Sequence, residues 1–181
     1  KVFGFINDKG RIPGIDILLK ENQKQKIGNL EFKVIFIPGH TKGHIAFYFD
    51  KEKIVFTGDT LFFSGCGRVF EGTHEDMFKS LNKLKNLPSE TKVYCGHEYT
   101  KNNLDFCLKY DSKNSILKEK SVKISSKLEN KLPSIPTTIG EELMTNIFLR
   151  CGDKDIKEAL NLKGSPDHEI FTKLRDLKDA F

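Results

Sequence analysis

Three stretches of the sequence place a possible metal ligand just after an apolar run and a glycine. Asp59 follows the run Ile54 to Thr57 and then Gly58 in IVFTGDTLFFSGCGRVFEG. His40 follows FKVIFIPG, and His97 follows KVYCG. Imidazole and carboxylate groups are ligands that zinc and iron take in proteins. The three side chains could therefore chelate metal if the strands before them end at one edge of a sheet.

Asp59 is the expected centre of this group. The β-branched and aromatic residues from Ile54 to Thr57 predict a buried strand, and Gly58 allows the backbone to turn sharply after it. A carboxylate directly after such a strand has lost much of its water, so it needs a cation or several hydrogen-bond donors to stay charged. We therefore expect His40 and His97 to gather around Asp59.

The motifs PGHTKGH, FTGDTLFFSGCGR and YCGHEYT together resemble the second half of the metallo-β-lactamase-fold hydrolases, and specifically glyoxalase II, the hydroxyacylglutathione hydrolases. The resemblance runs in order from about Lys1 to Phe181. It implies an α/β fold, with part of an αββα sandwich over residues 1–108 and an all-helical substrate-binding appendage over residues 109–181. It also implies hydrolysis of S-(2-hydroxyacyl)glutathione thioesters, such as S-D-lactoylglutathione to D-lactate and glutathione, by a hydroxide that two divalent metals activate.

The same resemblance implies roles for individual residues. Asp59 would be the catalytic carboxylate that bridges the two metals, with His40 completing the first shell and His97 the second; zinc is the expected metal, and iron or manganese are alternatives. His44, the second histidine of GHTKGH, would donate a hydrogen bond that orients a ligand or closes the loop. The residues expected to contact the substrate are Arg68, Phe70, Tyr99, Arg175 and Lys178.

Two features depart from the pattern of the family. The first metal motif of the family, THxHxDH, supplies four ligands and does not occur in these residues. His40, Asp59 and His97 alone give each metal one imidazole and a share of one carboxylate, fewer than a four-ligand shell. A polypeptide that begins at Lys1 is therefore expected to bind metal weakly or not at all and to be inactive, whereas a longer protein would hold the full site. Phe70 replaces a tyrosine, so one hydroxyl contact is lost.

Two other interpretations stay open. Persulfide dioxygenases share the fold, use one iron and take a glutathione-derived substrate, which would make this chain an oxidoreductase. The phrase GRVFEG, the motif HEY and the basic pair Arg175 and Lys178, which lie on one helical face and could grip one carboxylate, favour the hydrolase. The second interpretation is an inactive, truncated chain that keeps the fold without the metals.

Composition excludes several kinds of partner. The formal net charge is +5, but the lysines alternate with acids, which is typical of a solvated surface rather than a nucleic-acid footprint and still favours a small anionic substrate. No apolar run approaches membrane-spanning length. The four cysteines have no CxxC spacing, which predicts reduced thiols in the cytoplasm. The oligomeric state and an organellar targeting segment upstream of Lys1 stay open.

The pattern of apolar residues predicts the elements that position these motifs. Strands are expected at 30–37, 45–49, 54–57 and 92–95, with a helix between the last two that starts at a capping box of Thr73 and Asp76. Only helices are expected after Tyr99, and the last should have Ser165 as its N-cap. Residues 1–28 are weakly patterned, and LPSIPTT predicts a surface linker.

Overall fold

A mixed sheet of six strands organises the first part of the computed structural model, which describes residues 1–181. The strands lie in the order β10 (Thr137–Thr138), β9 (Lys92–Cys95), β6 (Ile54–Gly58), β5 (Ile45–Phe49), β4 (Leu30–Phe36) and β3 (Lys24–Ile27). Strands β6 and β9 are parallel, and β5 is antiparallel to both β4 and β6. Strands β4, β6 and β9 therefore run in one direction, and their carboxyl ends meet at one edge of the sheet.

Helix α1 (His74–Lys85) packs its apolar residues against one face of this sheet. Val55 and Val93 of the sheet are fully buried and share one core cluster with Met77, Leu81 and Leu84 of the helix. The predicted capping box is confirmed, because the Thr73 hydroxyl accepts a hydrogen bond from the Asp76 N–H and the Asp76 carboxylate accepts one from the Thr73 N–H. The opposite face holds a smaller cluster around Leu19, Phe32, Val34 and Phe49.

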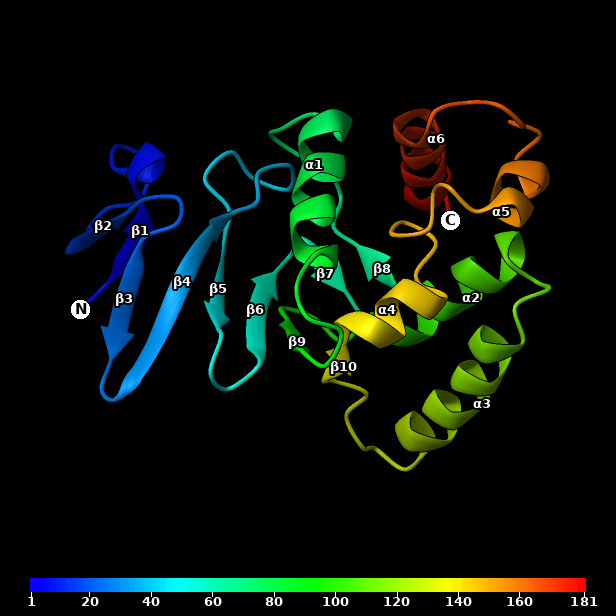
Figure 1. The fold of residues 1–181 in the computed structure, drawn as a ribbon, viewed down its shortest axis with the longest axis horizontal. Coiled ribbons are helices and arrows are strands. Elements are labelled where there is room, and N and C mark those ends of the chain that lie inside the picture. The colour runs from blue at the N-terminus through cyan, green and yellow to red at the C-terminus, as the bar shows by residue number, and fades with distance from the viewer.

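The chain after β9 is helical except for β10, and its helices lie at one end of the sheet (Figure 1). Its helices are α2 (Thr100–Tyr110), α3 (Ser115–Glu129), α4 (Ile139–Thr145), α5 (Lys154–Ala159) and α6 (Asp167–Asp179). Buried residues of these helices belong to the same core cluster as α1 and the sheet. The predicted α/β part followed by a mostly helical region is confirmed, and the proposed boundary at residue 108 falls within α2. The expectation of helices alone after Tyr99 is wrong, because the end of the predicted surface linker LPSIPTT pairs with β9 as strand β10 and buries Ser134 and Thr137.

Several short elements differ from the expectation. The weakly patterned residues 1–28 form β1 (Phe3–Phe5), the 3-10 helix η1 (Ile6–Asp8), β2 (Ile17–Leu19) and β3, which are too short for a clear alternating pattern. Strands β7 (Leu61–Phe62) and β8 (Gly65–Cys66) form a small hairpin. The expected N-cap at Ser165 is wrong by one position, because Pro166 has extended dihedral angles and α6 begins after it. No helix has the length and apolar character needed to cross a bilayer.

Candidate metal centre

His40, Asp59 and His97 converge, as their motifs predict, at the edge where β4, β6 and β9 end. The His40 Nε2 atom lies 3.4 Å from Asp59 Oδ2, and the His97 Nε2 atom lies 3.4 Å from Asp59 Oδ1. Each carboxylate oxygen therefore faces a different imidazole. This arrangement places one carboxylate between two nitrogen donors, which is how a carboxylate would bridge two cations.

The hydrogen bonds of His40 leave one nitrogen free to bind a cation. Its Nδ1 atom lies 2.9 Å from the Arg68 carbonyl oxygen, which can only accept, so Nδ1 carries the proton of the neutral ring. The lone pair of Nε2 then faces the Asp59 carboxylate. Two lone pairs that face each other repel unless a proton or a cation lies between them. The tautomer of His40 thus favours a cation at this point.

Asp59 itself carries an unsatisfied oxygen. Its Oδ1 atom is buried and has no hydrogen-bond partner. A buried carboxylate oxygen without a partner is costly, and a bound cation would remove the cost. Gly96, from the motif YCGHEYT, makes the close approach possible, since a Cβ at this position would lie 2.5 Å from the same oxygen.

His44 contacts the backbone of Asp59. The Asp59 N–H donates to His44 Nε2 at 3.2 Å, and the Thr41 hydroxyl lies 3.5 Å from His44 Nδ1. Burial, with a smaller contribution from His40, lowers the pKa of His44, so the ring is neutral and Nε2 can accept. Gly58 has the positive φ that the turn before Asp59 requires. His44 therefore accepts a hydrogen bond from the Asp59 backbone, whereas the sequence predicted that it would donate one; its role in orienting a ligand stays a prediction.

These residues could supply part of the ligands of two neighbouring cations, but they do not form a complete ligand shell around one. No group of three or more His, Cys, Asp and Glu side chains in residues 1–181 is arranged around a single ion. His40 and one oxygen of Asp59 would serve the first cation, while His97 and the other oxygen would serve the second. A tetrahedral zinc shell needs two further ligands at each position.

Three of the expected substrate contacts surround this centre. Phe70 is 66% exposed, and its ring centroid lies 5.1 Å from that of His40. Tyr99 stacks on His97 with centroids 4.9 Å apart. The exposed Arg68 guanidinium donates to the Asp179 carboxylate at 3.1 Å, so the end of α6 lies beside the loop that follows Asp59.

Arg175 and Lys178, the predicted basic pair of α6, do not converge on one point. Arg175 is 4% exposed and donates to the Cys66 carbonyl at 2.7 Å and to Asp179 at 2.9 Å. Lys178 donates instead to the carbonyl oxygen of Asn102 at 3.2 Å. The shared grip expected from their spacing is absent in this conformation, because the Arg175 guanidinium is occupied within the protein. A direct contact between either residue and substrate stays a prediction.

Asp179 lies beside the candidate site through its contact with Arg68, and it was not predicted from the sequence. One of its oxygens accepts from both Arg68 and Arg175, and it thus joins the exposed loop to the buried guanidinium. Its position four residues after Arg175 on one helix was the available signal.

Comparisons with known proteins follow the two parts of the fold. The family model of the Metallo-beta-lactamase superfamily matches residues 3–97, and that of the Hydroxyacylglutathione hydrolase C-terminus matches residues 98–181. The hydroxyacylglutathione hydrolase of Pelagibacter ubique is 52% identical over 99% of this chain and 70% of its own length. That of Chelativorans sp. is 48% identical over 99% of this chain and 71% of its own length. The crystal structure of ETHE1 from Myxococcus xanthus superposes with a TM-score of 0.59 over 99% of this chain and 65% of its own, at 23% identity, a likeness that shows the fold alone.

Proposed function

This chain belongs to the metallo-β-lactamase superfamily and, within it, to the hydroxyacylglutathione hydrolases, and on this premise we propose that it hydrolyses S-(2-hydroxyacyl)glutathione thioesters. The expected substrate is S-D-lactoylglutathione, which would give D-lactate and glutathione. The observation that carries the proposal is the Asp59 carboxylate, with each oxygen facing a different imidazole nitrogen. Thioester hydrolysis needs an activated water and a group that stabilises the oxyanion, and such a pair of half-shells suits that chemistry.

His40, Asp59 and His97 are the residues of this chain that would hold two divalent cations, and zinc is the proposed metal. When bound, the cations supply a hydroxide near neutral pH and polarise the thioester carbonyl. Asp59 would keep the two positions at a fixed spacing, because its carboxylate is shared. The Arg68 carbonyl would keep His40 in the tautomer that presents Nε2. His44 would hold the Asp59 backbone in place.

Basic side chains of the loop after Asp59 and of α6 would bind the glutathione part of the substrate. Glutathione carries two carboxylates, which suit the exposed guanidinium of Arg68 and the ammonium of Lys178. Tyr99 and Phe70 border the two imidazoles and would pack against the thioester and its acyl group. The four free cysteines agree with a reducing compartment such as the cytoplasm.

The protonation of Lys178 makes substrate binding dependent on pH. Burial, with a smaller contribution from Arg175, lowers the pKa of Lys178 from its usual value to about 8. The ammonium is therefore present below pH 8 and lost as the pH rises through that value. We expect KM for S-D-lactoylglutathione to rise by about tenfold once Lys178 is neutral, which corresponds to the loss of one charged hydrogen bond. Lys178→Arg keeps its charge at high pH and should flatten this rise; an unchanged pH profile in that variant would exclude Lys178 as the carboxylate contact.

The test of the proposed function compares two reactions on the protein as its gene encodes it, loaded with zinc, iron or manganese. Hydrolysis of S-D-lactoylglutathione releases a free thiol without consuming oxygen, and this is the expected result. A persulfide dioxygenase would instead consume oxygen when given glutathione persulfide. That alternative is not favoured, because the chain belongs to the hydrolase family. Oxygen uptake without thioester hydrolysis would overturn the proposal.

A further inference from the structure

The β7–β8 hairpin begins two residues after Asp59, and the helical part holds it through five hydrogen bonds to its backbone. All five come from side chains of α2, α4 and α6 or of the residue that follows α4. The bonds run from Asn103 to the Phe63 carbonyl, from the Ser64 N–H to Glu142, from Cys107 to the Ser64 carbonyl, from Asn146 to the Gly65 carbonyl and from Arg175 to the Cys66 carbonyl. Four are donated to hairpin carbonyls, and only Glu142 accepts.

Glu142 is the only charged side chain of α4 that is fully buried, and its carboxylate is the centre of a network. Its Oε2 atom accepts from the Ser64 N–H at 2.8 Å and from Asn146 Nδ2 at 2.9 Å. Its Oε1 atom accepts from the Thr137 hydroxyl at 2.8 Å. Ser64 is one of the few non-glycine residues with a positive φ, so its backbone conformation needs support from its surroundings.

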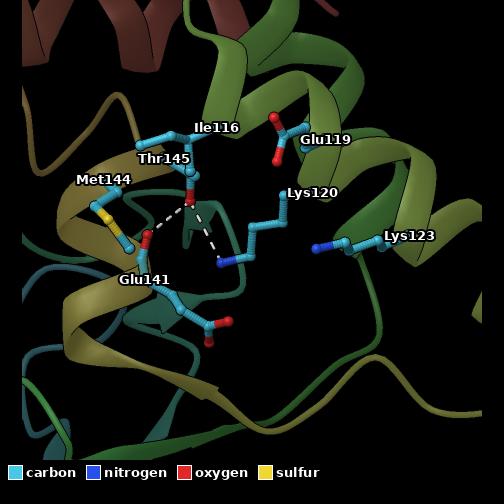
Figure 2. Close-up of a pocket in the computed structure, with 7 residues that line it drawn as sticks. All are labelled: Ile116, Glu119, Lys120, Lys123, Glu141, Met144 and Thr145. Carbon is cyan, nitrogen blue, oxygen red and sulfur yellow. Dashed lines mark hydrogen bonds between the residues drawn. The ribbon is translucent and has the colours of Figure 1, made fainter.

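Lys120 of α3 approaches the same network from the solvent side. Its ammonium lies 3.8 Å from Glu142 Oε1 and 4.2 Å above the ring of Phe63 in the hairpin. Figure 2 shows Lys120 extending from α3 toward α4, with its ammonium beside the Thr145 hydroxyl. A cavity of about 150 Å³ borders this side chain. Burial raises the pKa of Glu142 and lowers that of Lys120, which disfavours the charged form of each group. The opposite charge of the partner and the surrounding hydrogen bonds counteract this effect.

The hairpin connects this network to the metal centre. Leu61 and Cys66 pair across its base, the Thr57 hydroxyl donates to the Leu61 carbonyl at 2.8 Å, and the Gly67 N–H donates to the Thr60 carbonyl at 3.1 Å. Asp59 lies between Thr57 and Thr60, within the segment that these bonds fix. A shift of the hairpin would therefore move the Asp59 backbone.

We propose that Glu142 is a positioning residue for the metal centre: by accepting the Ser64 N–H it holds the β7–β8 hairpin, and through the hairpin it holds Asp59. This inference rests on the proposed function for its catalytic consequence, but not for its structural part. It makes the helical appendage a support of the hydrolytic centre in addition to a surface for substrate. Glu142 lies on the helical side of the hairpin, apart from the residues expected to touch metal or substrate.

Two substitutions with side chains about as long as that of glutamate separate the effect of the hydrogen-bond acceptor from the effects of charge and volume. Glu142→Gln keeps an oxygen for the Ser64 N–H and Asn146 and can donate to the Thr137 hydroxyl, whereas Glu142→Met keeps the volume without an acceptor. Thr137→Val serves as the matched control, because it removes the bond to Oε1 and leaves the bond from Ser64 to Oε2 in place. The measurements are amide exchange at Ser64, the amide chemical shift of Asp59, the stability to urea, and kcat/KM for S-D-lactoylglutathione per folded molecule.

We expect Glu142→Met to speed exchange at Ser64, shift the Asp59 amide resonance and lower kcat/KM by about tenfold through misplacement of the centre. Glu142→Gln should keep the exchange rate, the Asp59 resonance and kcat/KM close to those of the unmutated protein. Thr137→Val should lower the stability to urea without changing these three quantities. Unchanged exchange at Ser64 in Glu142→Met would overturn the inference, as would released exchange with an unmoved Asp59 resonance. If the unmutated protein shows no hydrolysis, the proposed function fails, and the exchange and chemical-shift results still decide the role of Glu142.

Discussion

Asp59→Asn is expected to lower kcat/KM for S-D-lactoylglutathione by about 10³-fold, which corresponds to about 4 kcal/mol of lost transition-state stabilisation. Each oxygen of the carboxylate lies 3.4 Å from a different Nε2 atom, Oδ2 from that of His40 and Oδ1 from that of His97. Asparagine has one carbonyl oxygen, so one of the two proposed cations would lose its carboxylate ligand and meet an amide N–H₂ group instead. The measurements are steady-state hydrolysis and metal content after loading.

The same substitution should raise the stability of the metal-free protein. Asp59 Oδ1 is buried without a hydrogen-bond partner, whereas an asparagine N–H₂ group could donate to the nearby Nε2 atom. We expect the free energy of unfolding in a chelating buffer to rise by about 1 kcal/mol. Asp50→Asn is the control, because this carboxylate is 73% exposed and follows the end of β5 opposite to the end that His44 precedes; it should change activity by about twofold at most. Retention of activity within tenfold in Asp59→Asn would contradict the bridging role.

The convergence of the three candidate ligands could be predicted from the sequence because each of their motifs is local. His40, Asp59 and His97 each follow a strand within a few residues, and the strands were recognisable from their apolar runs. That β4, β6 and β9 run in one direction then brings their ends together. The glycines of the motifs also had a physical reason, because Gly96 leaves room for the Asp59 carboxylate.

The partners of the basic residues could not be predicted in the same way. The helical spacing of Arg175 and Lys178 gives their position on α6, but not the direction of their charged groups. Arg175 donates to the carbonyl of Cys66, which is 109 residues away in the sequence, and Glu142 accepts from Ser64 at a separation of 78 residues. Such contacts depend on how the helices pack against the hairpin. No local pattern records that packing.

The packing that places α6 beside the hairpin depends on the buried aromatic residue Phe171. Its side chain is fully buried, and its ring centroid lies 5.7 Å from that of Phe78 in α1 and 6.0 Å from that of Phe148. Helices α1 and α6 contact each other at this point. Arg175 lies one turn after Phe171 on the same helix. The hydrogen bond from its guanidinium to the Cys66 carbonyl therefore depends on the packing of α6 against α1.

Phe171→Ala should therefore lower the free energy of unfolding by about 4 kcal/mol, through the lost transfer free energy of the ring and the cavity that it leaves. Phe171→Leu keeps most of the volume and should cost about 1.5 kcal/mol or less. Val122→Ala, at a site that is 72% exposed on α3, should change stability by about 0.5 kcal/mol at most. Urea unfolding monitored by circular dichroism measures all three. Removal of a phenyl ring from a well-packed core site costs several kcal/mol of stability. A loss below about 1 kcal/mol in Phe171→Ala would therefore contradict this packing role and would mean that the polar bonds of Arg175 and Asp179 chiefly hold α6.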